Sequence, residues 1–239
     1  MIKLITLDLD NTLWDVTPVL IAAESKLQEY IHTHIPEAKA HYQWDNLSQI
    51  RKEILRQRPE VKNLPTTLRL NLLQDCFMQA GFRTAAAEQL AQEAFDIFLT
   101  YRNNIPLFPE TLPLLTRLSQ EFELIALSNG NADINRVGLG HFFRAHFSAE
   151  SVGKPKPAPD MFESALAHAQ VDASEAIHIG DHQEEDVEAA RRLGFHTIWF
   201  NQHGKQIEQT CEPTVQVHTL NELEKAVFAL CEAKKNPAL

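Results

Sequence analysis

The first fifteen residues of the chain, Met1–Asp15 (MIKLITLDLDNTLWD), decide how the fold begins. An apolar stretch at 2–7, typical of a buried strand, leads directly into Asp8 and Asp10. Two carboxylates so close together repel each other, and burying either one costs free energy unless a positive partner is present. The sequence therefore predicts that a cation lies at the end of this first strand.

Composition limits the kinds of partner that the chain can have. The net charge of −10 argues against a nucleic-acid partner, because binding to a phosphate backbone depends on lysine and arginine. The three cysteines are far apart in the sequence, which favours a reducing compartment. No apolar run in the sequence is long enough to span a membrane. We expect a cytoplasmic protein, a monomer or weak homodimer, with no membrane or nucleic-acid partner.

The hydrophobic pattern divides the chain into a helical segment and a segment where strands alternate with helices. Residues 17–104 carry apolar side chains at helical spacing without a convincing strand. After residue 105, strands expected at 122–127, 176–179, 195–200 and 214–217 alternate with helices, which predicts a doubly wound parallel α/β sheet. The predicted domains are therefore a Rossmann-like core, 1–16 and 105–239, and an inserted helical domain, 17–104.

Polar residues follow three of the predicted strands, where an open α/β sheet binds its ligands. Asp8 and Asp10, two residues apart at a strand end, are expected to point to the same side. A calcium loop is a poor alternative, because Leu13 and Val19 stand where such a loop needs glycine and glutamate. A turn or capping aspartate explains one of the two carboxylates but not both.

A third carboxylate, Asp181, follows the strand at 176–179, and Asp186 lies five residues further on. Gly180-Asp181 alone is typical of a turn, but its place after a strand favours a functional interpretation. A few hard oxygen ligands with room for water and phosphate suit Mg²⁺, which would also offset the repulsion between the carboxylates. The histidines flanking the pair, His178 and His182, are expected to be structural.

Hydroxyl, amide and ammonium groups stand between these carboxylates in the sequence. Ser128 and Asn129 end the strand at 122–127, where they suit either a turn or the oxygen atoms of a phosphate. Lys156 lies among prolines in K-P-K-P-A-P, and a stiff backbone is a costly way to present a random surface lysine. Lys154 in the same stretch is a competing choice.

Four patterns, D-L-D-N-T, S-N-G, K-P-x-P-x-x-F and G-D-x-x-x-x-D, resemble in order and spacing the motifs of the haloacid dehalogenase superfamily. The match extends from residue 2 to about residue 200, and the helical segment occupies the place of the family's helical cap. The resemblance implies a Rossmann-like core with a mobile cap and a Mg²⁺-dependent hydrolase. One departure is Glu185, which stands where family members often carry asparagine, and Glu188-Ala189 replaces a common Gly-Ala.

The resemblance also implies a role for each matching residue. Asp8 would be the nucleophile that forms an aspartyl-phosphate, and Asp10 would protonate the leaving alcohol and then activate water. Ser128 would bind the phosphoryl group, and Lys156, which the full motif favours over Lys154, would hold phosphate and nucleophile together.

The expected metal ligands are Asp8, the Asp10 carbonyl and Asp181, with Asp186 in or near the coordination sphere. Asn129, Asn11 and Trp14 complete the expected substrate-binding set, Trp14 by stacking on a substrate ring.

The residue at position 10 indicates the type of reaction, and two longer stretches of sequence indicate the substrate. The dehalogenases of the superfamily usually carry a different residue there, so an acid at Asp10 favours hydrolysis of a phosphate ester. LDLDNTLWD-x-x-P-V and SNGNAD…GLG-x-x-F further resemble bacterial flavin-pathway phosphatases, which act on FMN and on 5-amino-6-(5-phospho-D-ribitylamino)uracil. The alternatives are a sugar-phosphate or nucleotide phosphatase, a phosphoglucomutase-like enzyme, and a catalytically silent module that binds a phosphometabolite.

Overall fold

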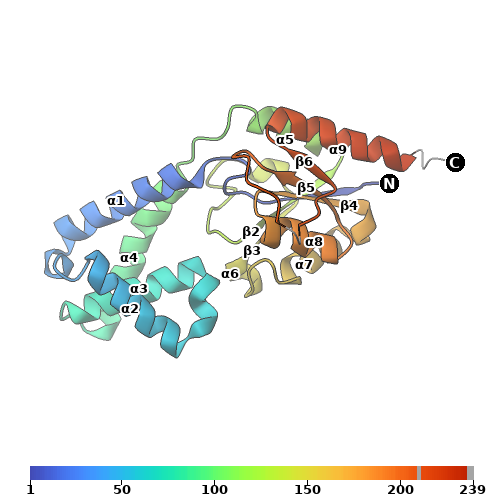
Figure 1. Cartoon of the computed structure of the whole chain (residues 1–239). Helices are drawn as coiled ribbons and strands as arrows, with labels where there is room; N and C mark the ends of the chain where they lie inside the picture. The colour runs from blue at the N-terminus through green and yellow to red at the C-terminus, as the bar shows by residue number, and fades with distance from the viewer. Residues whose placement is uncertain (209–210, 236–239) are drawn as a thin grey trace. The chain divides into compact units, whose positions relative to one another are not determined.

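A computed structural model of the chain describes residues 1–208 and 211–235, and these residues form two compact units (Figure 1). One unit comprises 1–15, 106–130 and 134–239, and the other comprises 16–105 and 131–133. The predicted core segment 105–239 includes residues 209–210 and 236–239, which lie outside the described residues. Among the described residues, no helix combines the length and the apolar character that a membrane crossing requires.

The strands are β1 (Leu4–Leu7), β2 (Glu123–Ser128), β3 (Ala145–Ser148), β4 (Ala176–Gly180), β5 (His196–Phe200) and β6 (Val215–Val217). The helices are α1 (Val16–His34), α2 (Trp44–Gln57), α3 (Pro65–Gln79), α4 (Thr84–Arg102), α5 (Thr111–Ser119), α6 (Ala149–Val152), α7 (Asp160–Ala169), α8 (Ala189–Arg192) and α9 (Leu220–Lys235). Short 3-10 turns at Pro36–Ala38, Pro59–Asn63, Gly140–Phe142 and Ala173–Glu175, and a π-helical turn at Gln183–Glu188, complete the regular structure.

The first unit is a six-stranded sheet of order β3-β2-β1-β4-β5-β6 in which every paired strand is parallel. All four residues of β1 and all five of β4 are buried, as expected for central strands that are covered on both faces. In Figure 1, α5 and α9 lie on one side of this sheet and α7 and α8 on the other. The predicted doubly wound α/β fold is confirmed.

The order of the strands places three chain segments side by side at the carboxyl edge of the sheet. β1 pairs with β2 on one side and β4 on the other, with Leu7 opposite Ala126 and Ile179. The strand order reverses on the two sides of β1, and such a reversal leaves a crevice outside the strand ends. The residues that follow β1, β2 and β4 therefore meet there.

Two local features differ from the sequence-based expectations. β3 is an edge strand that the sequence analysis missed, because its four residues, AHFS, are only half-buried and do not form an apolar run. The helix expected between the strands at 176–179 and 195–200 starts as a π-helical turn at Gln183 and continues into α8. This turn places the Asp186 carboxylate against Gly180, the last residue of β4, and so brings Asp186 to the carboxyl edge of the sheet.

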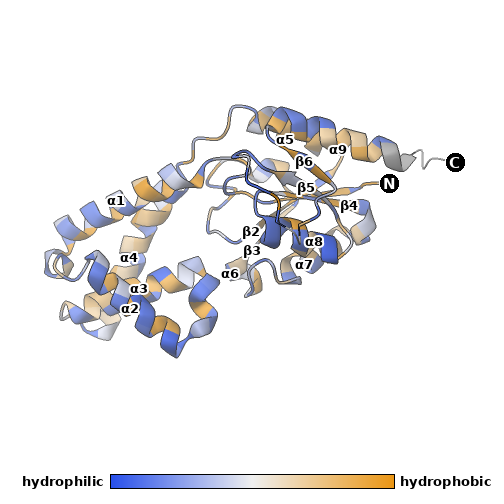
Figure 2. Cartoon of the chain, viewed as in Figure 1, coloured by the Kyte–Doolittle hydropathy of each residue, from blue (hydrophilic) through white to orange (hydrophobic). Residues whose placement is uncertain are grey.

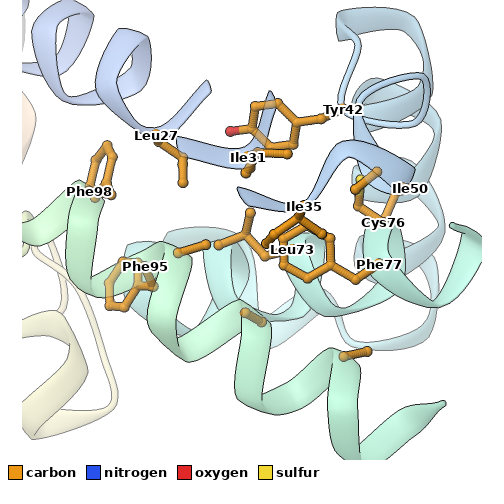
Figure 3. Close-up of a cluster of buried hydrophobic side chains, with 14 of the residues drawn as sticks. Leu27, Ile31, Ile35, Tyr42, Ile50, Leu73, Cys76, Phe77, Phe95 and Phe98 are labelled. Carbon is orange, nitrogen blue, oxygen red and sulfur yellow. The ribbon is translucent and has the colours of Figure 1, made fainter. Parts of the chain in front are cut away.

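The second unit is a helical bundle with its own hydrophobic core. Buried side chains of α1 recur every four residues, at Val19, Ala23, Leu27 and Ile31, which places them on one face of the helix. Figure 3 shows Leu27, Ile31, Ile50, Phe77 and Phe95 among the side chains that fill the space between α1, α2, α3 and α4. Each large apolar side chain buried in this way contributes roughly 1.5–3 kcal/mol relative to exposure.

The hydropathy of the residues differs between the strands of the sheet and the helices of the bundle. In Figure 2 the strands of the sheet are mainly orange, whereas α2 and parts of α1 show alternating blue and orange segments. This amphipathic pattern is typical of helices that bury one face and expose the other.

Candidate active site

The predicted site residues of the first unit come together at the carboxyl edge of the sheet. Asp8 directly follows β1, and its backbone N–H donates to the Ile179 carbonyl of β4 at 2.8 Å. Ser128 is the last residue of β2, and Asp181 directly follows β4. Because β1 lies between β2 and β4, the three polar segments are adjacent although Ser128 comes 120 positions after Asp8 in the sequence.

Lys156 provides a positive charge at the end of β1, beside Asp8. Its Nζ donates to Asp8 Oδ1 at 2.8 Å and to Asp186 Oδ1 at 2.5 Å. The side chain is only 1% exposed. Lys154 is 63% exposed instead and pairs with Asp160 at 2.9 Å, so Lys156 is the lysine of this stretch that contacts Asp8.

Burial and charge act in opposite directions on this group. Burial and the neighbouring carboxylates of Asp186 and Asp181 raise the pKa of Asp8 well above its usual range, although Lys156 opposes the shift. Burial also opposes ionisation of Asp186, but Lys156 and His178 outweigh it and hold the pKa of Asp186 below its usual range. Burial lowers the pKa of Lys156, but the carboxylates of Asp186 and Asp8 outweigh it and raise that pKa, so the ammonium form persists.

A divalent metal ion fits the remaining negative charge. Asp8, Asp181 and Asp186 each offer an oxygen atom, and these three atoms lie within 4.8 Å of one another. Burial first, and then the charge of Asp186, raises the pKa of Asp181. Clustered hard oxygen donors with an excess of negative charge suit Mg²⁺, and the residues present therefore fit the expected ion.

Asp186 is engaged by hydrogen-bond donors on both of its oxygen atoms. Oδ1 accepts from Lys156 and lies 3.1 Å from His178 Nε2, and Oδ2 accepts from the backbone N–H of His182 at 2.9 Å. Gly180 makes room for this carboxylate, because a Cβ atom there would lie 2.3 Å from Cγ and Oδ2 of Asp186. Asp186 thus holds the Lys156 ammonium group in place. Because both of its oxygen atoms already accept hydrogen bonds, fewer lone pairs are left to coordinate a metal ion.

The loop after β1 orients the two aspartates differently. Thr12 Oγ1 donates to Asp8 Oδ2 at 3.3 Å, while Trp14 Nε1 donates to Asp10 Oδ1 at 2.7 Å. Asn11 adopts a φ of 61°, a left-handed conformation that asparagine tolerates better than most residues, and the chain reverses there. Trp14 is fully buried, so the expected stacking of its ring on a substrate is wrong. Its indole N–H instead fixes the direction of the Asp10 carboxylate.

Ser128 and Asn129 both lie at the carboxyl edge of the sheet, but their side chains contact different groups. Ser128 Oγ accepts from the backbone N–H of Gly130 at 3.0 Å, which keeps the hydroxyl at the end of β2. The Asn129 side chain accepts from the Lys156 N–H at 2.7 Å and donates to the Lys156 carbonyl at 2.9 Å. It also donates to Glu185 at 2.9 Å. The Asn129 amide therefore clamps the backbone of Lys156, and this use was not expected from the sequence.

The sequence analysis also missed Lys205 and Asn201. Lys205 Nζ lies 3.5 Å from Asp181 Oδ2, and its side chain is about half exposed. The buried Asn201 accepts from the Lys205 N–H at 2.8 Å and donates to the Lys205 carbonyl at 2.9 Å. No sequence pattern places a lysine five residues after β5 beside Asp181, because the contact depends on the path of this loop.

The glutamates that depart from the family pattern differ in their surroundings. Glu185 accepts from Asn129 beside the Lys156 backbone. Glu188 is buried but turns toward Arg191, with contacts of 2.9 and 3.0 Å to the guanidinium group. His182 is exposed and its Nδ1 accepts from the Glu185 N–H at 3.2 Å, so this histidine caps the π-helical turn.

Comparison with known proteins places this site in a family. The family model for haloacid dehalogenase-like hydrolases matches residues 2–194. The chain is 28% identical over 217 residues, 91% of each chain, to 5-amino-6-(5-phospho-D-ribitylamino)uracil phosphatase YigB of Escherichia coli. It is 29% identical to phosphoserine phosphatase of Thermus thermophilus over 62% of this chain and 61% of that one.

A solved structure is also similar over nearly the whole chain. The crystal structure of a 2-haloacid dehalogenase from Pseudomonas syringae pv. Tomato DC3000 has a TM-score of 0.93 and 37% identity, and it covers 96% of this chain and 100% of that one. The expectation of a hydrolase with the four ordered motifs is confirmed. The chain belongs to the haloacid dehalogenase-like hydrolases.

Proposed function

We propose that the protein is a phosphomonoesterase that hydrolyses a small phosphorylated metabolite through an aspartyl-phosphate on Asp8. The observation that carries this proposal is the buried Lys156 ammonium between Asp8 and Asp186, beside a third carboxylate, Asp181. This arrangement combines a nucleophilic carboxylate with a fixed cation for the charge that phosphoryl transfer spreads over oxygen atoms.

The first step uses the two aspartates of the β1 loop. An Asp8 carboxylate oxygen attacks phosphorus, so that a new O–P bond forms as the ester P–O bond breaks. The leaving oxygen takes a proton from the Asp10 carboxyl and departs as the alcohol. Trp14, which donates to Asp10 Oδ1 at 2.7 Å, holds that carboxyl in one orientation for the transfer.

The second step regenerates the free carboxylate. Asp10, now ionised, takes a proton from a water molecule whose oxygen attacks phosphorus, and the bond between phosphorus and Asp8 breaks to release phosphate. Lys156 stays hydrogen-bonded to Asp186 throughout, which keeps its charge beside the phosphoryl group. Ser128 and the backbone N–H groups that follow it supply donors to the phosphoryl oxygens, while the Asn129 side chain holds Lys156.

A magnesium ion is the expected cofactor. Asp8, the Asp10 carbonyl and Asp181 would hold it, with Asp186 next to them, and it would neutralise charge on the phosphoryl oxygens when bound.

The first candidates for the substrate are FMN and 5-amino-6-(5-phospho-D-ribitylamino)uracil. The similarity to the Escherichia coli phosphatase named for the latter compound supports this choice, because it extends over 91% of both chains. A sugar-phosphate or nucleotide phosphatase, or a phosphoglucomutase-like enzyme, is the alternative on the same core. A module that binds a phosphometabolite without turnover is the alternative that lacks catalysis.

A 2-haloacid dehalogenase is a second candidate function, which the similar Pseudomonas syringae structure raises by its title. Halide departs without a proton, so that reaction has no use for a general acid. Asp10 and the indole N–H that orients it therefore favour the phosphatase over the dehalogenase.

The test is a substrate panel measured with Mg²⁺ and again with EDTA. The panel contains FMN, 5-amino-6-(5-phospho-D-ribitylamino)uracil, phosphoserine, sugar phosphates, nucleotides and 2-chloropropionate, with release of phosphate or chloride as the readout. We expect phosphate release that EDTA abolishes and that is fastest for the flavin-pathway compounds. The Asp8→Asn variant should fold and release no phosphate, and Lys154→Met serves as the matched control with unchanged activity.

Each other outcome changes one part of the proposal. Fastest release from sugar phosphates or nucleotides would keep the mechanism and replace the substrate, and transfer back to the substrate would indicate a mutase. Chloride release without phosphate release would assign the dehalogenase. An active Asp8→Asn enzyme would refute the aspartyl-phosphate mechanism, and binding without any release would indicate a silent module.

A further inference from the structure

A row of buried polar side chains leads from the middle of the sheet to the site. Thr6 of β1 and His178 of β4 stand opposite each other in the parallel register, and Asp186 lies beyond His178. The three residues are 0%, 1% and 2% exposed. Their neighbours in β4, Ala176, Ile177 and Ile179, are apolar, as central strands usually are. Burying a histidine side chain in such a strand costs free energy unless its ring nitrogens are hydrogen-bonded.

The partners of His178 determine which of its ring nitrogens carries the proton. Asp186 is ionised and can only accept, so Nε2, 3.1 Å from Asp186 Oδ1, must be the donor. Nδ1 lies 2.7 Å from Oγ1 of Thr6, which also lies 3.4 Å from the Ile177 carbonyl oxygen. The ring of Phe162 stands edge-on at a centroid distance of 4.9 Å and restricts rotation of the imidazole.

The oxygen atom that His178 contacts is the one that holds the lysine. Asp186 Oδ1 accepts from His178 and from Lys156 Nζ, and the same Nζ donates to Asp8 at 2.8 Å. A second donor on this oxygen fixes the plane of the carboxylate, and the carboxylate in turn fixes the ammonium group. The hydrogen bond from His182 N–H to Oδ2 holds the other end of the same carboxylate.

We propose that His178, oriented by Thr6, is a positioning residue that sets the place of Lys156 against Asp8 through the Asp186 carboxylate. The proposal rests on the proposed function, in which Asp8 is the nucleophile and Lys156 its cation. His178 itself is buried in the sheet and touches neither the nucleophile nor a substrate. Outer partners of this kind typically change activity 10–100-fold when they are removed, because the inner groups lose their alignment.

The experiment compares two amides at position 178. His178→Gln places an amide N–H where Nε2 stands and keeps the donor to Asp186, whereas His178→Asn is shorter and keeps only a partner for Thr6. We expect kcat of His178→Asn to fall about 10–100-fold with little change in KM, and His178→Gln to recover most of the loss. Thr6→Val, which removes the hydroxyl at nearly constant volume, should lower kcat by a smaller factor in the same direction.

A second readout does not depend on turnover. The side-chain ammonium signal of Lys156 in the ¹H–¹⁵N NMR spectrum, assigned by its loss in Lys156→Met, should shift in His178→Asn and stay in place in His178→Gln. A protein without any phosphatase activity but with this pattern would refute the proposed function and retain the positioning role. An active enzyme in which His178→Asn leaves both kcat and the ammonium signal unchanged would refute the positioning role alone.

Thr197→Val is the matched control for a merely structural effect. Thr197 is a buried threonine of β5 that stands opposite His178 in the register, but it exchanges hydrogen bonds with Thr214 and not with the site. This variant should lose stability while kcat of the folded enzyme stays the same. A loss of kcat in the His178 and Thr6 variants that merely follows their unfolding midpoints, as in Thr197→Val, would overturn the proposal.

Discussion

Replacement of Lys156 by methionine tests the electrostatic core of the site. Methionine has a similar length and fits irregular spaces, so the change removes the charge with little change in packing. In the wild type the ammonium group contacts Asp8 and Asp186, whose side chains are 11% and 2% exposed. Removing one partner of a buried ion pair costs about 3–5 kcal/mol, because the other charge stays buried without compensation.

The pH dependence of this loss follows from the two states of Asp186. In the wild type the pKa of Asp186 is lowered, so its stabilising contribution is present above the ordinary carboxylate pKa and is lost as the pH falls below about 4. Without Lys156, the pKa of Asp186 is higher than in the wild type, so the variant gains less stability than the wild type as the pH rises through the carboxylate range. The difference between wild type and variant should therefore be largest near pH 8 and shrink toward pH 5.

The assay is unfolding by heat and by urea at pH 8 and pH 5 in EDTA, followed by circular dichroism. At 2–4 °C per kcal/mol for a protein of this size, the loss corresponds to a decrease in Tm of about 6–20 °C near pH 8. Lys154→Met, which removes an exposed lysine two residues away, should leave the free energy of unfolding unchanged. Lys156→Met/Asp186→Asn should recover part of the loss. A Lys156→Met variant as stable as Lys154→Met, or equally destabilised at both pH values, would refute the reasoning.

Three further substitutions test other parts of the site. Gly180→Ala should lower kcat 10–100-fold, because the new Cβ would lie 2.3 Å from Asp186 and displace its carboxylate; a crystal structure and kcat measurements check both effects. Trp14→Phe should lower kcat about tenfold with KM unchanged, since it keeps most of the buried ring but removes the indole N–H from Asp10, the proposed general acid; unchanged kcat would count against the orienting role of the indole N–H. Lys205→Met should tighten Mg²⁺ binding by up to about fivefold in calorimetric titrations, because it removes a half-exposed cation 3.5 Å from Asp181; weaker binding would contradict this account.

The sequence was sufficient for the parts of the site that depend on strand ends. Asp8 and Asp181 follow apolar runs, and in a parallel sheet such residues must share an edge, so their meeting could be predicted without coordinates. The family motif favoured Lys156 over Lys154, and the structure gives the physical reason, because the loop buries the Lys156 side chain and leaves that of Lys154 exposed. β3 was missed for a related reason, since an edge strand needs no continuous apolar pattern.

Side-chain direction was harder to predict than position. Trp14 was placed correctly in the loop after β1, but an aromatic residue near a site suits both stacking and structural support. The burial of the Trp14 ring and its hydrogen bond to Asp10 favour a structural role for this side chain. The side chain of Asn129 likewise suits a phosphate or a backbone, and only the two hydrogen bonds to Lys156 show which group it contacts.

The two lysines near the carboxylates are held in the same way, and the physical reason is the flexibility of lysine. Asn129 and Asn201 each accept from the N–H and donate to the carbonyl of one lysine, Lys156 and Lys205 respectively. Ordering a lysine side chain costs up to about 2 kcal/mol in rotamer entropy, so a mobile backbone would add to that loss. Clamping the main chain leaves only the side chain to be ordered. The clamped backbone of Lys156 and the carboxylate of Asp186 thus fix the two ends of one flexible side chain, which explains how a loop residue can hold a charge beside Asp8 as firmly as a residue of the sheet.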